Sequence, residues 1–315
     1  MSDAAPVRRV FVLGGGASLG AHQVGAMRYL EEQGIRPDAI VASSIGVINA
    51  CLYASGGVDH MEDAWTGLGS VTTKFRPSLK HNPISGYSLF SMDPLAEAIE
   101  EYVDFKNILQ SPLDLSFVLL NVSRGEGQFA TNRHMSSVRE ARTLMRAGYA
   151  IPMLFPPVRH KGEYYVDGGF AWNVPVLQAI EMGATEVYVL AVIASALPYK
   201  RRFTSPLDYY GRLADVMWRT IGNVGYVTTG IDRDGSYQGV PVTVLQPTEQ
   251  NAGFSPISLF SWSSKRTERL ITAGYSDAKR TMSGARRRKA AGAPVRAAVD
   301  AEEAAVSPAY EHEVA

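Results

Sequence analysis

The sequence predicts an α/β fold in which helices cover a parallel β-sheet. Two short apolar runs, residues 10–13 and 39–42, have the length and composition of buried strands. A stretch with apolar side chains at helical spacing follows each run, over residues 20–33 and 45–54. Strands that alternate with helices are joined by crossover connections, so they lie parallel in one sheet.

The alternation continues less regularly along the rest of the chain. No repeat of fixed period is present. From residue 284 the composition shifts to Ala, Glu and Arg with few large apolar side chains, which is typical of a disordered tail. We expect one folded domain over residues 1–283 and a tail over 284–315. Further strands are expected at 115–122, 163–166, 186–193 and 240–245, and further helices at 174–182, 205–220 and 258–282.

Composition and charge exclude several classes of protein. Hydrophobic residues make up 46% of the 315 residues, enough for a sizeable core. Lys plus Arg and Asp plus Glu balance at 31 each, so we expect no nucleic-acid partner. The single cysteine, Cys51, excludes an internal disulfide and suits a reducing compartment. Without a signal-peptide pattern or an apolar run of about 20 residues, we expect a cytoplasmic protein, with at most peripheral membrane contact.

Ser44 lies between the second predicted strand and the helix that follows it. A serine in such a sharp turn is presented at the carboxyl end of the sheet, provided that the residues two before and two after are small. Ala42 and Gly46 occupy those positions. The positive end of the helix favours negative charge beside Ser44. The pattern fits a nucleophile, and it also fits a serine that only caps a helix.

A glycine-rich loop, residues 14–20, follows the first predicted strand. Its backbone N–H groups can form a cradle for an anion, which in acyl transfer is the oxygen of the tetrahedral intermediate. Two nucleotide-binding patterns do not fit. The dinucleotide fingerprint requires glycine where Leu19 stands, and the phosphate loop requires lysine where Ala21 stands.

Asp167 is the candidate for the base that activates Ser44. In an α/β-hydrolase the triad runs serine, acid, histidine, but the only histidine after Asp167 is His312 in the expected tail. A serine hydrolase built on this chain therefore needs another base. Asp167 follows a predicted strand and precedes two glycines, an arrangement that also occurs in ordinary hairpin turns.

Together these segments resemble the patatin-like phospholipases, in particular a bacterial branch with a GGGALGAYQ-like loop and a GTSIGAINA-like elbow. The resemblance covers about residues 8–283, the expected catalytic domain. It is carried by residues 15–23, 42–50, 82–90, 167–169 and 173–175, with a weaker similarity at 273–278.

The resemblance implies a three-layer α/β/α sandwich with a mostly parallel central sheet. It also implies a Ser-Asp dyad that needs no histidine, metal or cofactor. By position, Ser44 is the nucleophile, Asp167 the base, and the backbone N–H groups of Gly15, Gly16 and Ala17 the oxyanion hole. The implied activity is hydrolysis of fatty acyl esters in phospholipids or other lipids. Two alternatives remain: a thioesterase or acyltransferase on carrier- or CoA-bound chains, and a catalytically weakened binding protein.

The chain departs from the family pattern at Ala17 and Ala42, where the family has glycine. Alanine tolerates positive φ poorly. An alanine at each position suggests a backbone that accepts a Cβ, so we expect negative φ at both.

Other residues that stand out favour structural roles. We expect His22 to be a surface or helix-packing residue and Cys51 to be a core residue. For the aromatic-rich segments that contain Tyr209, Tyr210, Met217, Trp218 and Trp262 we favour the core over a membrane-facing patch.

Overall fold

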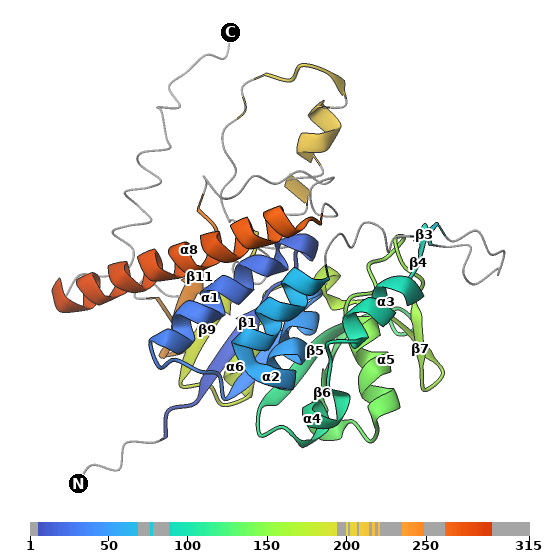
Figure 1. The fold of residues 1–315 in the computed structure, drawn as a ribbon, viewed down its shortest axis with the longest axis horizontal. Coiled ribbons are helices and arrows are strands. Elements are labelled where there is room, and N and C mark those ends of the chain that lie inside the picture. Colours follow the sequence, from blue (N-terminus) through green and yellow to red (C-terminus); the bar gives the residue numbers. More distant parts are fainter. Residues whose placement is uncertain are drawn as a thin grey trace.

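Nine strands form one sheet in the described part of the chain, in the order β10-β11-β9-β1-β2-β5-β8-β7, with β6 also paired to β5 (Figure 1). The five central strands are parallel. They are β1 (Arg9–Leu13), β2 (Ala39–Ala42), β5 (Asp114–Asn121), β9 (Glu186–Leu190) and β11 (Val240–Leu245). The computed structural model describes residues 6–68, 76–77, 88–193, 200, 202–206, 208–213, 216–217, 220, 235–248 and 262–291.

Antiparallel strands flank the parallel centre on both sides. They are β6 (Glu126–Thr131), β7 (Val158–His160), β8 (Glu163–Asp167) and β10 (Ser236–Tyr237). A separate two-stranded sheet joins β3 (Arg76–Pro77) to β4 (Phe90–Ser91). The central sheet is thus mostly parallel at its core and mixed at its edges.

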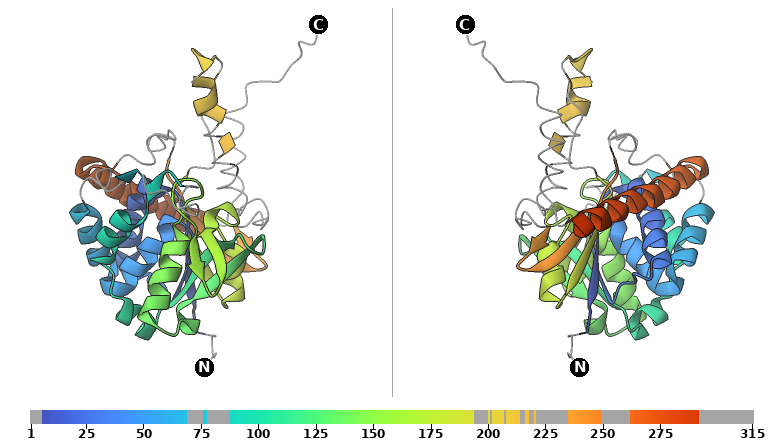
Figure 2. Two further views of the ribbon diagram at one scale, coloured as in Figure 1. Left: turned by 90° about the vertical axis from the view of Figure 1, so that its right-hand side faces the viewer. Right: turned by 90° about the vertical axis from the view of Figure 1, so that its left-hand side faces the viewer.

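Helices cover both faces of the sheet. Along β1, Phe11 and Leu13 point into the larger core under α1 and α2, whereas Val10 and Val12 point into a smaller core under α6. Because both faces of β1 are covered, all four side chains are apolar. The predicted three-layer α/β/α sandwich is confirmed (Figure 2). The helices are α1 (Ala21–Glu32), α2 (Ile45–Gly67), α3 (Asp93–Glu100), α4 (Phe105–Gln110), α5 (Val138–Gly148), α6 (Val176–Glu181) and α8 (Ser264–Ala291), with short 3₁₀ turns η1 (Ala17–Gly20), η4 (Asn132–His134) and η5 (Gly168–Phe170).

Several helix ends differ from the prediction. The helix expected to end at residue 54 continues as α2 to Gly67, across a kink at Gly56 and Gly57 where the backbone leaves helical angles. The last helix, α8, runs to Ala291, eight residues past the expected end of the domain at 283. The rest of the expected tail, residues 292–315, lies outside the described residues, as do residues 82–87 of one family-like motif.

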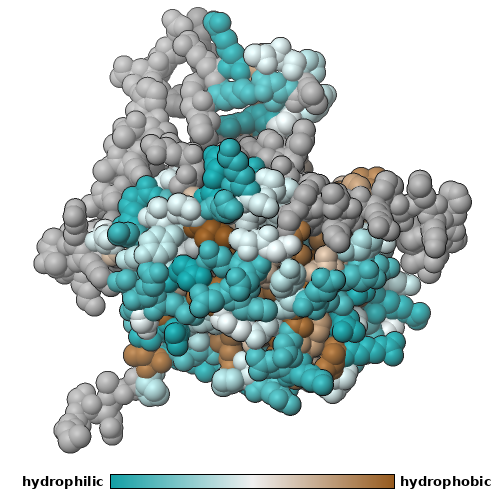
Figure 3. Space-filling view, in the orientation of Figure 1, coloured by the Kyte–Doolittle hydropathy of each residue, from teal (hydrophilic) through white to brown (hydrophobic). Residues whose placement is uncertain are grey.

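The outer surface is mostly hydrophilic on the face of Figure 1, where hydrophobic residues appear as separate patches (Figure 3). The large apolar side chains are mainly taken up by the two cores. Among the described residues, no helix combines the length and the apolar character needed to cross a membrane.

Candidate active site

Ser44 occupies a tight turn between β2 and α2. Its backbone angles are φ 54° and ψ −124°, which L-residues seldom adopt outside such elbows. Gly46 is required because a Cβ there would run into the main-chain carbonyl of Leu13. Ser44 is 8% exposed, so it is buried at the carboxyl edge of the sheet and does not lie on the outer surface.

The register of the sheet explains why Asp167 reaches Ser44 from far along the chain. Ala42, the last residue of β2, is level with Phe117 of β5. β5 continues past that level, and its Leu119 pairs with Asp167 at the end of the antiparallel strand β8. Leu119 is two residues beyond Phe117, as Ser44 is two beyond Ala42. Asp167 therefore ends its strand at the height of the elbow.

The side chains of Ser44 and Asp167 form a direct hydrogen bond. The Ser44 hydroxyl donates to Asp167 Oδ2 at 2.6 Å, and the Gly169 N–H donates to Asp167 Oδ1 at 2.8 Å. Asp167 is 2% exposed, and its burial raises the pKa of the carboxyl to about 6, against the smaller opposing effect of the two hydrogen bonds. The carboxyl is therefore a stronger base than an exposed aspartate.

The glycine loop lies directly against Ser44. A Cβ on Gly15 would come within 2.6 Å of Ser44 Cβ and of Asn173 Oδ1, so only glycine fits. The Gly15 N–H donates to Asn173 Oδ1 at 2.8 Å. In the described part of the chain, no acceptor takes the N–H of Gly16 or Ala17. Of the three expected oxyanion donors, Gly15 is thus engaged within the protein, and the other two remain candidates.

The expectation of negative φ at both alanines is wrong for Ala17. Its φ is 48°, in the left-handed region, whereas Ala42 lies in β2 and is not among the residues with positive φ. An alanine at this position therefore does not imply negative φ, because surrounding contacts can hold a residue in an unfavourable conformation.

His22 is buried, and its imidazole Nε2 lies 3.0 Å from Asp277 Oδ2, joining α1 to α8. The expected helix-packing role fits this contact. Cys51 is fully buried in the core, as predicted.

The expectation of a core position is wrong for part of the aromatic segments. Tyr209, Tyr210 and Met217 are between 47% and 63% exposed. Trp262 is buried and stacks on Trp65, with 5.2 Å between ring centroids. Trp218 lies outside the described residues.

Three polar residues at the site received no role from the sequence. Asn173 contacts the glycine loop, and Gln23 and Asn49 lie fully buried beneath it. Each belongs to a segment that carries the family resemblance. An amide in the middle of an apolar helix, such as Asn49 between Ile48 and Ala50, was the available indication that a buried hydrogen-bond network is present.

A family model for the patatin-like phospholipases matches residues 11–180. The chain belongs to the patatin-like phospholipase family. This confirms the resemblance to that family. The carboxyl edge of its parallel strands carries Ser44 and the glycine loop, as is usual for sites in open α/β sheets.

Two curated proteins and one solved structure are similar to this chain to different degrees. The lysophospholipase nte1 of Aspergillus terreus is 27% identical over 184 residues, which cover 58% of this chain and 12% of that protein. The human patatin-like phospholipase domain-containing protein 6 is 29% identical over 189 residues, covering 58% and 13%. The chain thus spans about an eighth of the length of these relatives. The solved structure of VipD from Legionella pneumophila aligns over 89% of this chain and 68% of its own, with 13% identity and a TM-score of 0.47.

Proposed function

We propose that this protein is a serine acyl hydrolase that cleaves fatty acyl esters of phospholipids or other lipids, with Ser44 as nucleophile and Asp167 as base. The observation that carries the proposal is the 2.6 Å hydrogen bond from the Ser44 hydroxyl to Asp167 at the carboxyl edge of the sheet. The lipid substrate is inferred from membership of the patatin-like phospholipase family.

The reaction proceeds in two acyl transfers. Asp167 accepts the Ser44 proton as the Ser44 oxygen attacks the ester carbonyl carbon, and the N–H groups of Gly16 and Ala17 stabilise the resulting oxyanion. When the intermediate collapses, the ester C–O bond breaks and Asp167 returns the proton to the leaving alcohol. Water then attacks the acyl-enzyme with Asp167 again as base, which releases the fatty acid and restores Ser44.

Burial makes Asp167 suited to this role. A base works best when its pKa lies near the working pH, and the Asp167 pKa of about 6 is closer to neutrality than that of an exposed aspartate. The strained elbow fixes the position of Ser44, and burial of the dyad limits the access of water. Both effects add to what the basicity of Asp167 supplies.

The proposal is tested with a panel of acyl esters and an active-site fluorophosphonate probe. Ser44→Ala should abolish both hydrolysis and labelling, and Asp167→Asn should lower turnover by about 10²–10⁴-fold. Labelling that persists in Ser44→Ala would identify another nucleophile. Turnover of Asp167→Asn within a few-fold of wild type would rule out the dyad.

The same panel separates the alternatives. A thioesterase or acyltransferase would prefer CoA or carrier thioesters to the matched oxygen esters. A catalytically weakened binding protein, which the strained Ala17 would favour, would bind lipid but label slowly with the probe.

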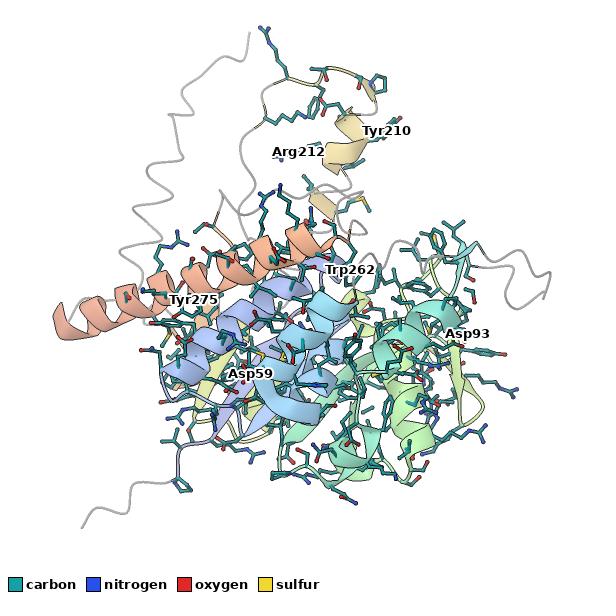
Figure 4. All side chains as sticks on the ribbon, in the orientation of Figure 1. Asp59, Asp93, Tyr210, Arg212, Trp262 and Tyr275 are labelled. Carbon is teal, nitrogen blue, oxygen red and sulfur yellow. The ribbon has the colours of Figure 1, made fainter. Side chains whose placement is uncertain are left out.

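We also propose peripheral membrane contact, on the cytoplasmic side, through the segment around Tyr210. Phe203, Tyr209 and Tyr210 are exposed and pack edge-on in a chain of rings, with centroids 5.3 and 5.6 Å apart. Figure 4 shows Tyr210 and Arg212 on a helical segment that stands away from the sheet. Aromatic and basic side chains together suit the interface of an anionic membrane.

Vesicle sedimentation tests this contact. Tyr210→Ser should weaken binding to vesicles of phosphatidylcholine and phosphatidylserine while hydrolysis of a soluble ester is unchanged. Equal binding of wild type and variant would show that the segment does not contact the membrane.

A further inference from the structure

Three buried amide side chains surround the glycine loop without a part in the proposed proton transfer. Gln23 on α1 and Asn49 on α2 are completely buried, and Asn173, which follows η5, is 7% exposed. They come from three separate parts of the chain and meet at residues 14–20. Buried amides carry a desolvation cost unless every hydrogen-bonding group finds a partner, so their partners indicate what they do.

Gln23 and Asn49 hold the two ends of the loop. Gln23 Nε2 donates to the carbonyl of Gly14 at 2.8 Å and to that of Leu190, on the neighbouring strand β9, at 2.9 Å. Asn49 Nδ2 donates to the carbonyl of Gly20 at 3.0 Å. The first and last residues of the loop are therefore each held by the side-chain amide of a buried residue.

These two amides are also fixed to one another. Asn49 Nδ2 donates to Gln23 Oε1 at 2.7 Å, and the Trp65 indole N–H donates to Asn49 Oδ1 at 2.7 Å. Both N–H groups and the oxygen of each amide are engaged. A fully satisfied buried network of this kind specifies one arrangement and resists rotation of its members.

Asn173 holds the loop in the middle. Its Oδ1 accepts from the Gly15 N–H at 2.8 Å, and its Nδ2 donates to the Gly15 carbonyl at 3.4 Å. Both polar groups of Gly15 thus face one side chain, from the segment that follows Asp167 and η5. The peptides of Gly16 and Ala17 follow directly after this fixed point.

We propose that Gln23, Asn49 and Asn173 are positioning residues that hold the glycine loop at both ends and in the middle, so that the N–H groups of Gly16 and Ala17 point at the developing oxyanion. The inference rests on the proposed hydrolase function. It accounts for the positive φ of Ala17, because a strained backbone persists only where its surroundings fix it. Donors fixed in advance are what makes an oxyanion hole effective.

The test compares Asn49→Ala and Asn173→Ala with Asn132→Ala. Asn132 is a matched control, since it is 2% exposed and its amide makes three hydrogen bonds to main-chain groups of Ile108, Leu113 and Leu115. It lies at the opposite, amino-terminal edge of β5.

For Asn49→Ala and Asn173→Ala we expect kcat on a soluble ester to fall about 10–100-fold with KM within about threefold. Displaced N–H donors stabilise the transition state less but leave substrate binding unchanged. For Asn132→Ala we expect a lower melting temperature with kcat within about twofold. Hydrogen-exchange mass spectrometry should show faster exchange over residues 14–20 in Asn173→Ala but not in Asn132→Ala.

If the wild type is active and Asn173→Ala keeps both the wild-type kcat and the wild-type hydrogen-exchange rate over residues 14–20, the inference is overturned. An equal loss of kcat in all three variants would also overturn it, because it would reduce the effect to lost stability. Inactive, unlabelled wild type would instead contradict the proposed function. If Asn49→Ala does not fold, the decision falls to Asn173→Ala, whose side chain lies on a loop.

Discussion

At the scale of single residues, two backbone positions at the site have positive φ without being glycine. At Ser44 (φ 54°) the conformation belongs to the elbow and presents the hydroxyl to Asp167. At Ala17 (φ 48°) it sits at the start of η1, where the family has glycine. In the proposed mechanism the first strained conformation places the nucleophile. The second is unfavourable only because of the Ala17 methyl group, so replacing Ala17 with glycine should relieve it.

Ala17→Gly should raise the free energy of unfolding by about 0.5–1 kcal/mol. Glycine removes the cost of holding a Cβ in the left-handed region, and this gain is larger than the cost of glycine's greater conformational freedom in the unfolded chain. Ala42→Gly is the matched control: Ala42 is buried in β2 without positive φ, so the same change should cost about 1–2 kcal/mol. Chemical denaturation of both variants measures this. We expect turnover of Ala17→Gly to stay within about twofold, and a large gain would favour the weakened-enzyme alternative.

The pKa of Asp167 links both activity and stability to pH. Since only the carboxylate can accept the Ser44 proton, kcat/KM on an uncharged ester should rise as pH increases through about 6. The folded-state pKa is raised above the unfolded value of 3.8, so the protonated group stabilises the fold at low pH. That stability is fully present below about pH 4 and is lost as pH rises through about 6.

Asp167→Asn removes this dependence. The variant should gain stability relative to wild type as pH rises from about 4 to 7, by at most about 3 kcal/mol, and its amide oxygen can still accept from the Gly169 N–H. Thermal melts of both proteins across that range provide the measurement. A difference that does not change with pH would mean that Asp167 titrates as an ordinary exposed aspartate.

At the scale of elements, the sequence was most informative for apolar strands of the parallel centre of the sheet. β2 and β11 have the predicted bounds, and β1 begins one residue earlier. β6 was missed because its residues are half-buried and its sequence, EGQFAT, has little apolar character. α5 was missed although Ala141, Leu144 and Met145 recur at helical spacing, so there the pattern was available.

Ser44 and Asp167 could each be singled out as candidates from local sequence, but their contact could not be predicted. Ser44 and Asp167 are 123 residues apart and meet because β8 runs antiparallel to β5, which extends past β2. Strand direction at the edge of a sheet depends on long-range pairing that no short pattern encodes. The same holds for Asn173, whose partner Gly15 is 158 residues away.

The crossing of α1 and α8 offers a test of packing between elements. A Cβ on Gly274 would collide with the main-chain carbonyl of His22, a group that cannot rotate away. Gly274→Ala should therefore cost about 1–3 kcal/mol through overpacking. Gly211→Ala is the control, since a Cβ there meets nothing within 4 Å and should leave stability unchanged or slightly raised. Equal effects in denaturation would show that the helices separate without cost.

At the scale of the whole molecule, one sheet with its two cores forms the domain, and α8 closes it against α1. The hydrogen bond between His22 and Asp277 and the buried side chains of Ala278 and Met282 anchor α8. Figure 1 shows the far end of α8 extending beyond the other helices. The last described buried residue of α8 is Met282, one residue before the expected domain boundary.

Truncation after Ser283 tests that boundary. We propose that residues 1–283 fold and act alone, so the melting temperature should change by no more than about 2 °C and ester hydrolysis should be retained.

Truncation after Ser276 is the contrasting variant. It removes Asp277 and leaves the buried His22 without its partner, and it also removes the core contacts of Ala278 and Met282. Losses of this kind cost several kcal/mol together, so this shorter chain should be strongly destabilised. If truncation after Ser283 is equally damaging, the helical residues 284–291 are part of the domain and the boundary lies further along the chain.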